Sequence, residues 1–265
     1  MSSSATYLDR ILERHRLVAS EDARDVEDLA ARCLLMKPAR GFRQRLLEDS
    51  GSGVSVISEI KRRSPSKGVL AADLDPVALA EQYQAGGASC LSVLTDEEFF
   101  GGSIHDLQIA ASACELPVLR KDFTVSRHDV CDARLMGSDC VLLIAAALTA
   151  HELVNFHELA SEIGLDVLVE IHDERELDHA LAAQATLIGV NQRDLTTFKV
   201  DHERALRMAA VIPDGVVRVA ESGIRNSQDA GELYAAGYHA VLVGESLVTS
   251  SDPAEAVRQL RYSNR

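Results

Sequence analysis

The amino-acid sequence predicts one closed (β/α)8 barrel, and three observations carry that prediction. Its 265 residues come close to the roughly 250 that such a barrel needs. From residue 54 onward, short runs rich in apolar and β-branched residues alternate with longer segments of helical period, as in parallel strands joined by crossover helices. These runs are of uniform spacing, and no Gly-rich dinucleotide turn follows the first of them. A closed barrel is therefore favoured over an open doubly wound sheet.

Eight strands are expected, in the order of the chain. They lie at residues 54–61, 90–95, 117–123, 140–145, 166–171, 187–191, 216–220 and 240–243. Helices are expected between them, for example at 76–85, which begins with a proline, and at 150–163, which Gly164 would end. Glycine also precedes several strands, as helix C-caps require.

Residues 1–50 are interpreted as an N-terminal helical extension, and residues 51–265 as the barrel, within a single domain overall. Amphipathic stretches at 7–17 and 26–35 predict helices that pack over one mouth of the barrel. A partly disordered tail is the alternative for the first few residues, and a flexible linker is the alternative for residues 49–53.

Composition limits the class of protein. With 46% hydrophobic and 26% charged residues, the chain can bury a large core. It shows no long apolar run and no secretory signal pattern, so we expect a cytoplasmic protein without a membrane partner. A net charge of −14 argues against a nucleic-acid partner. It does not exclude an anionic small substrate, because the lining of a cleft sets the local field. The five scattered cysteines are expected to be reduced and buried.

Polar residues at the carboxyl ends of the predicted strands are the candidates for an active site, because barrels of this kind carry their chemistry there. Glu59 and Lys61 end the first strand and share one face, since side chains alternate with a period of two. Later strand ends supply Lys121, Glu170, Asn191, Arg193 and Glu221. Each alone could be a solvated residue or part of a structural ion pair. Their recurrence at equivalent strand ends predicts one shared pocket.

Two glycine-containing segments predict a phosphate site. Ser222 and Gly223 follow the seventh strand, while Gly244 and Glu245 follow the eighth. Barrels often hold a phosphate at these strand ends on backbone N–H groups and the N-terminus of a short helix. The alternative is that the two glycines only serve tight turns.

The nine histidines do not indicate a metal site. Neither His151 with His157 nor His172 with His179 forms an i, i+4 pair, and no H-x-x-x-H sequence with a partner carboxylate occurs. We expect these side chains at the surface or at helix ends.

From residue 54 to the last helix, the chain resembles the indole-3-glycerol-phosphate synthases. The matching motifs are residues 59–68, Leu94-Thr95-Asp96 with Phe100-Gly101-Gly102-Ser103, Lys121-Asp122-Phe123, Glu170-Ile171-His172, Asn191-x-Arg193-Asp194-Leu195 and Ala220-Glu221-Ser222-Gly223-Ile224. This family commonly has a second asparagine where this chain has Gln192. In a strand that side chain points away from Asn191, so we expect little consequence for function.

The resemblance implies a TIM barrel and a carboxy-lyase of tryptophan biosynthesis. Its substrate would be 1-(2-carboxyphenylamino)-1-deoxyribulose 5-phosphate, which undergoes ring closure, decarboxylation and dehydration to indole-3-glycerol phosphate. No cofactor or metal is implied. By the same resemblance Lys121 is the acid that protonates the developing oxyanion. Glu170 stabilises positive charge on the anilino nitrogen or shuttles a proton, and Glu59 acts as general acid or base in the dehydration.

The remaining roles also follow from the resemblance. Lys61 would engage an anionic end of the substrate, Asn191 and Glu221 would hold sugar hydroxyls and orient Lys121, and Arg193 would support the carboxylate side. The division of labour among Glu59, Lys61 and Glu170 stays open. Phe123, Leu142 and Leu195 would line an apolar slot for the anilino ring, together with Pro65, although Leu142 could equally be an ordinary core residue.

Residues 64–68, beginning at Ser64, are expected to form a lid over the substrate, because a small polar segment ending in glycine can close over a site. Lys67 could simply be solvated.

Two rival interpretations of the function are phosphoribosylanthranilate isomerase, which needs a cysteine where this chain has Glu59 and Lys61, and a noncatalytic phosphosugar-binding barrel. The intact acid and base positions argue against the second. The oligomeric state is open, with a monomer favoured.

Overall fold

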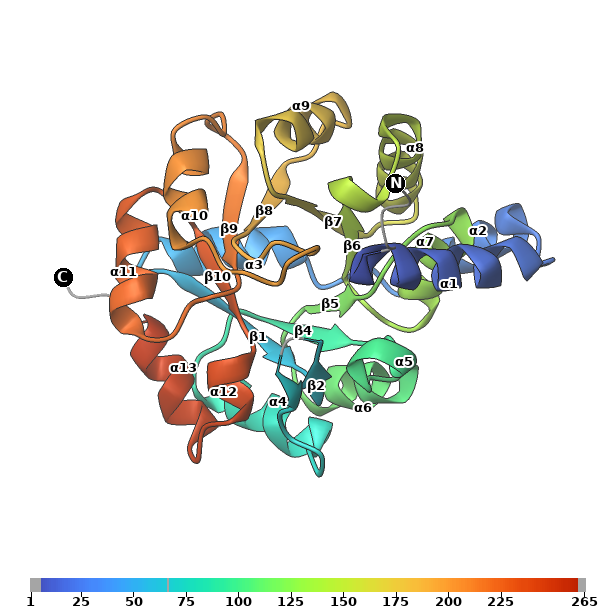
Figure 1. The fold of residues 1–265 in the computed structure, drawn as a ribbon. Helices are drawn as coiled ribbons and strands as arrows, with labels where there is room; N and C mark the ends of the chain where they lie inside the picture. Colours follow the sequence, from blue (N-terminus) through green and yellow to red (C-terminus); the bar gives the residue numbers. More distant parts are fainter. Residues whose placement is uncertain (1–5, 66, 262–265) are drawn as a thin grey trace.

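The computed structural model describes residues 6–65 and 67–261, and its centre is a closed barrel of eight parallel strands (Figure 1). Strand order around the barrel is β1-β10-β9-β8-β7-β6-β5-β4, and β4 pairs with β1 to close it. The strands are β1 (Ser55–Ile60), β4 (Cys90–Leu94), β5 (Val118–Lys121), β6 (Cys140–Ile144), β7 (Asp166–Ile171), β8 (Leu187–Asn191), β9 (Val217–Glu221) and β10 (Ala240–Val243). All eight strands expected from the sequence are confirmed, with ends that differ by one or two residues.

Helices surround the barrel, as Figure 1 shows. Each barrel strand is followed by one of the longer helices, which are α4 (Pro76–Ala85), α6 (Ile104–Ala113), α7 (Arg127–Leu135), α8 (Ala150–Glu162), α9 (Glu174–Ala182), α10 (His202–Ala209), α11 (Ser227–Ala235) and α13 (Pro253–Arg261). Short turns of helix add α5 (Glu97–Phe100), η1 (Ala145–Ala147) and α12 (Glu245–Val248). Ser, Thr, Asp or Asn side chains cap most of the N-termini, for example Asp173 on the backbone N–H of Glu176. Such caps satisfy N–H groups that have no partner within the helix.

Two short strands in the loop after β1 were not expected from the sequence. β2 (Arg63–Ser64) and β3 (Gly68–Val69) pair antiparallel and overlap the two ends of the predicted lid. Pairs this short carry no recognisable hydrophobic alternation. Ser66, which belongs to the predicted lid, lies outside the described residues.

Three N-terminal helices pack on the barrel, but not all over one mouth as we expected. α1 (Tyr7–Glu21) lies at the carboxyl ends of the strands, where it contacts residues that follow β4 and β5. α3 (Phe42–Ser50) closes the opposite mouth, since its backbone accepts hydrogen bonds from Ser55 and Cys90, the first residues of β1 and β4. α2 (Val26–Leu34) packs beside α7. The segment that forms α3 is mostly polar and was not predicted as a helix.

The hydrophobic core has two layers, one between the sheet and the surrounding helices and one inside the barrel. The inner layer includes Ile57, Leu119, Leu168 and Val219 on four different strands. It fills the barrel, so a ligand can enter only at a mouth. All five cysteines are buried and free, as expected. Among the described residues, no helix combines the length and apolar character needed to cross a membrane.

Candidate active site

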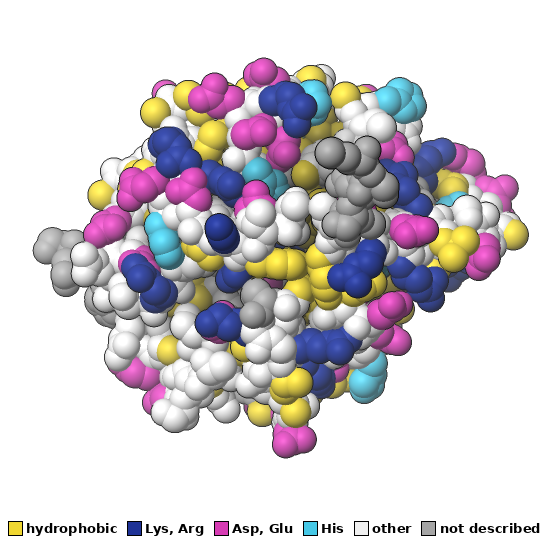
Figure 2. Space-filling model, in the orientation of Figure 1, with side chains coloured by type: hydrophobic (Ala, Val, Ile, Leu, Met, Phe, Trp, Pro, Cys, Tyr) yellow, Lys and Arg dark blue, Asp and Glu magenta, His cyan; other side chains and the backbone are white. Residues whose placement is uncertain are grey.

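A cavity of about 500 Å³ opens at the carboxyl ends of the barrel strands. Every site residue predicted from the sequence lines it: Glu59, Lys61, Ser64, Pro65, Lys121, Phe123, Leu142, Glu170, Asn191, Arg193, Leu195, Glu221, Ser222, Gly223, Gly244 and Glu245. In the space-filling view, basic side chains surround an apolar patch near the centre of the face seen in Figure 1 (Figure 2). Five Lys or Arg side chains line the cavity beside six carboxylates, so cationic groups are available to an anionic substrate.

The most buried part of the site is an ammonium group between two carboxylates. Nζ of Lys121, at the end of β5, lies 2.8 Å from Oε2 of Glu170 on β7 and 3.0 Å from Oε2 of Glu221 on β9. Nδ2 of Asn191 on β8 donates to Oε1 of Glu170 at 3.0 Å. Four strand ends therefore hold one network, in which the lysine cannot turn away without losing two charged partners.

Burial and mutual charge set the protonation states of this network. Burial opposes the charge of Lys121, but the two carboxylates outweigh it and raise the pKa of its ammonium above the ordinary value. Burial likewise opposes the charge of Glu170, yet Lys121, His172 and Asn191 lower its pKa to about 2. Burial and the charge of Glu170 outweigh Lys121 at the other carboxyl and raise the pKa of Glu221 to about 7. Glu170 therefore stays charged near neutral pH, while Glu221 can exchange a proton.

Glu59 and Lys61 form a second ion pair at the end of β1 and face the cavity together, as period-two alternation predicts. Gly244 adjoins this pair, since a Cβ added to it would meet the carboxylate of Glu59 and lie 3.1 Å from Nζ of Lys61. The backbone of Gly244 has a negative φ of −121°. A glycine is thus needed here for close approach and not for a left-handed turn.

The predicted phosphate residues gather at the ends of β9 and β10. Ser222 and Gly223 both have left-handed backbone, with φ of 67° and 76°. That conformation is strained for serine and is often retained at functional sites. At the same corner Nζ of Lys67 lies 3.5 Å from Oε1 of Glu245, so the predicted lid contacts the start of α12. Both side chains remain largely exposed, which leaves Lys67 partly solvated, as the alternative interpretation held.

Aromatic and aliphatic side chains form one wall of the cavity. Phe123, Leu195 and Pro65 line it as predicted, and Phe100 joins them with its ring centroid 6.2 Å from that of Phe123. Leu142 is both a cavity residue and a core residue, because it lines the cavity and its side chain, in the inner core layer, is 2% exposed. Sequence reasoning did not select Phe100, although the Phe100-Gly101-Gly102-Ser103 motif was available as a signal.

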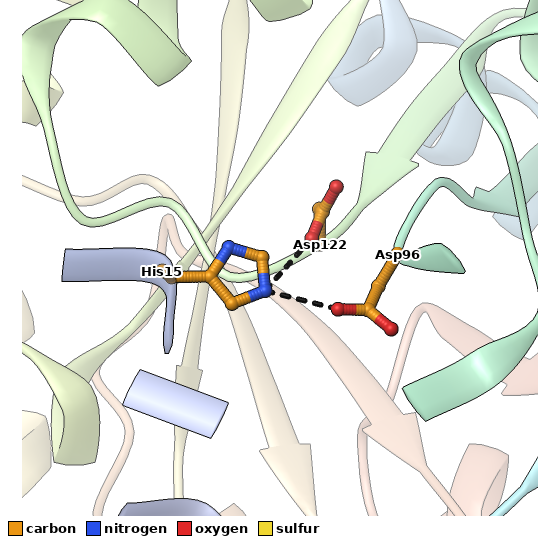
Figure 3. Close-up of side chains that lie close together, drawn as sticks. All are labelled: His15, Asp96 and Asp122. Atoms are coloured by element: carbon orange, nitrogen blue, oxygen red, sulfur yellow. Dashed lines mark hydrogen bonds and ion pairs between the residues drawn. The ribbon is translucent and has the colours of Figure 1, made fainter. Parts of the chain in front are cut away.

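A histidine on α1 joins the rim of the site (Figure 3). Nε2 of His15 lies 3.0 Å from Oδ2 of Asp96 and 3.8 Å from Oδ1 of Asp122, and its ring centroid is 5.5 Å from that of Phe123. Both carboxylates already accept other hydrogen bonds, Asp96 from the first turn of α5 and Asp122 from Arg120. The three groups are close enough to suggest a metal site, but this bonding favours an anchor for α1.

Our expectation that the histidines lie at the surface or at helix ends was wrong for His15, which is mid-helix and half-buried. It also failed to indicate that the side chain of His172, just after β7, is only 12% exposed. No local pattern marks His15, because both of its partners are more than 80 residues away in the sequence.

Comparison with known proteins identifies the family. The model of the family described as "Indole-3-glycerol phosphate synthase" matches residues 8–260. The chain belongs to this family. Its relatives include the indole-3-glycerol phosphate synthase of Kineococcus radiotolerans, 47% identical over 256 residues, which cover 96% of this chain and 87% of that protein. The Streptomyces griseus enzyme of the same name is 53% identical over 210 residues, 79% of this chain and 78% of that one.

A third relative with this name, from Chlorobium luteolum, is 46% identical over 252 residues and 93% of this chain, with 95% of its own length covered. Among solved structures, thiamine phosphate pyrophosphorylase from Pyrococcus furiosus superposes with a TM-score of 0.58 at 16% identity, over 80% of this chain and 95% of that one. This likeness shows the barrel fold alone. Membership of the synthase family confirms the resemblance that the motifs indicated and argues against the isomerase interpretation.

Proposed function

We propose that the chain is an indole-3-glycerol-phosphate synthase acting on 1-(2-carboxyphenylamino)-1-deoxyribulose 5-phosphate. The observation that carries this proposal is the buried contact of Lys121 with Glu170 and Glu221 at the ends of three strands. It joins an ammonium and a carboxylate whose surroundings favour their charged forms to a carboxyl whose pKa is raised to about 7. Ring closure needs these three kinds of group, because both negative and positive charge develop during the reaction.

In the first step, the ring carbon that bears the carboxylate bonds to the ketone carbon of the sugar. The carbonyl oxygen takes the electron pair of the broken π bond and accepts a proton. Lys121 is the proposed acid, and its buried ammonium also stabilises the oxyanion as it forms. Glu221, with a pKa raised to about 7, can return a proton to Lys121, since the two side chains are hydrogen-bonded.

Positive charge develops on the anilino nitrogen as the ring loses its aromaticity. The carboxylate of Glu170 is held in its charged form and is the proposed counter-charge. Cleavage of the bond to the carboxylate group then releases carbon dioxide and returns an electron pair to the ring. In the last step, the new hydroxyl leaves as water, and the carbon attached to nitrogen loses a proton. Glu59, paired with Lys61, is the proposed acid or base of this dehydration.

The rest of the cavity is proposed to bind the two ends of the substrate. Ser222, Gly223, Gly244 and Glu245 offer backbone groups to the phosphate at the ends of β9 and β10. A ring slot formed by Phe123, Leu142, Leu195 and Pro65 would hold the anilino ring, with Arg193 and Ser64 at its polar edge. Asn191 would fix Glu170 by its hydrogen bond and would also hold a sugar hydroxyl.

We further propose a cytoplasmic monomer with no nucleic-acid or membrane partner. The five free, buried cysteines suit a reducing compartment, and the net charge of −14 disfavours binding to phosphate backbones.

The first test is a fluorescence assay of the purified protein with the carboxyphenylamino-deoxyribulose phosphate and no added metal, following the indole product. Turnover that saturates with substrate is the expected result. Saturable binding of the substrate by a folded protein, without any product, would overturn the proposal and favour a noncatalytic phosphosugar-binding barrel.

A further inference from the structure

The imidazole ring of His172 lies between two carboxylates at the end of β7. Nδ1 is 3.0 Å from Oε2 of Glu176 on α9, and Nε2 is 3.8 Å from Oε1 of Glu170 in the active site. In the part of the chain that the structure describes, Nε2 has no hydrogen-bond partner, although it is shielded from solvent. A buried polar nitrogen without a partner is uncommon and requires a physical reason.

Glu176 determines which ring nitrogen carries a fixed proton. Its Oε2 accepts the backbone N–H of His172 at 2.7 Å and also contacts ring Nδ1. A charged carboxylate only accepts hydrogen bonds, so Nδ1 is the donor. The nitrogen that gains or loses a proton is therefore Nε2, which faces Glu170.

The charged groups around the ring are Glu170 on its own strand, Glu176 on α9 and Arg204 on α10. Burial opposes a charge on the ring, and Arg204 opposes it as well. The two carboxylates outweigh both effects and raise the pKa of His172 above its ordinary value. The ring therefore keeps the imidazolium form to a higher pH than an ordinary histidine, and in that form Nε2–H points its charge at Glu170.

We propose that His172 is a positioning residue of the ring-closure reaction: its imidazolium, held by Glu176, keeps the carboxylate of Glu170 directed at Lys121. The inference rests on the proposed function, because Glu170 must be charged to face the cation that forms on the substrate nitrogen. His172 is not among the residues that line the cavity. Its loss should therefore lower kcat and leave KM unchanged.

The first experiment compares pH profiles of kcat. Wild-type kcat is expected to decline about tenfold as pH rises through the pKa of His172, because the neutral ring presents the lone pair of Nε2 to Oε1 of Glu170 and no longer holds that carboxylate in place. His172→Gln places an amide N–H near the former Nε2, and His172→Asn places one near Nδ1. Both should lack this decline, keep the one that the titration of Glu221 produces, and work near the lower plateau, with the glutamine variant the more active. His179→Gln on α9 is the matched control and should behave as wild type.

The second experiment follows the imidazole signals of His172 by NMR and needs no turnover. Glu170→Gln is expected to lower the pKa of His172 by about one unit, whereas the titration of His179 should not move. An alkaline decline of the same size and midpoint in His172→Gln as in wild type, or a His172 titration unaffected by Glu170→Gln, would overturn the proposal. Absence of wild-type turnover would overturn the proposed function and this role with it. The NMR titration separates that failure from a failure of the coupling between the two side chains.

Discussion

Gly189 on β8 leaves the space that the carboxylate of Glu221 on β9 occupies. A Cβ built on this glycine would meet Oε1 of Glu221 at far less than contact distance. Because Oε2 of the same carboxyl accepts from Lys121, a methyl group here would push one partner of the lysine out of place. Gly189→Ala is expected to lower kcat about 10²-fold, since small misplacements of catalytic groups have effects of that size. Its cost in the free energy of unfolding should be about 1–3 kcal/mol.

Steady-state kinetics and chemical denaturation of this variant give the two quantities. Gly51→Ala is the matched control, because an added Cβ there would meet its nearest atom at 3.6 Å and its φ is −65°. A Gly189→Ala enzyme with wild-type kcat would show that Glu221 does not need its present position.

Lys121→Ala should reduce kcat/KM by about 10²–10⁴-fold, the usual range for loss of a general acid. The variant should fold and retain part of its substrate affinity, because the lysine acts mainly in the transition state. Without that cation, the pKa of Glu221 rises further above its ordinary value, and the pKa of Glu170 loses its main lowering influence, so burial raises it. The melting temperature of the variant should therefore fall more steeply than that of wild type between pH 5 and pH 8. Unchanged turnover would remove Lys121 from the mechanism.

The raised pKa of Glu221 makes a separate prediction about wild-type stability. Its pKa is about 7 in the folded protein against an ordinary value of 4.5. A group whose pKa is raised by folding contributes stability below its unfolded pKa, and this contribution is lost as pH rises through the folded value. Glu221→Gln should abolish that loss, so the variant gains on wild type between about pH 4.5 and pH 7, by on the order of 1–3 kcal/mol. Urea denaturation at several pH values measures the difference. If the free energy of unfolding depends on pH in the same way in the two proteins, the pKa of Glu221 is not raised by folding.

Most of the barrel and of its cavity could be predicted from the sequence for one physical reason. Strands of a parallel barrel are buried on both faces, so they read as continuous apolar runs such as the segment that became β6. A charged residue that ends such a run must lie at the carboxyl mouth, which is where Lys121 and Glu170 were found. Period-two alternation was sufficient to place Glu59 and Lys61 on one face.

What escaped prediction depends on contacts between distant segments. α3 is mostly polar, and only Phe42 and Leu46 bury it against the amino ends of the strands. His15 looks like any polar residue of an amphipathic helix until α1 is placed across the other mouth. Neither position follows from periodicity, because the choice of mouth is decided by long-range packing.

The contact of His15 with Asp96 and Asp122 predicts that the hold of α1 on the barrel depends on pH. Burial opposes the charge of the ring, but the hydrogen bond that the ring donates to Asp96 and the charges of Asp122 and Asp129 outweigh it and raise the pKa of His15. The stabilisation is therefore complete below about pH 6.5 and is lost as pH rises through the folded pKa. His15→Gln should increase amide hydrogen exchange in α1 at pH 6 and should differ little from wild type well above the folded pKa.

The ring of His15 also packs on Phe123, a wall of the proposed slot for the anilino ring. His15→Gln should therefore raise KM at pH 6 more than it lowers kcat. Arg14→Ala is the matched control on the same helix, because Arg14 pairs with Glu98 in an exposed contact that is worth about 0–1 kcal/mol. If His15→Gln matches Arg14→Ala in amide hydrogen exchange and in KM, both at pH 6 and well above the folded pKa, then the His15 contacts contribute no more than an exposed surface ion pair. A larger effect confined to low pH would show that the N-terminal helix is fixed to the rim of the site by a charged imidazole.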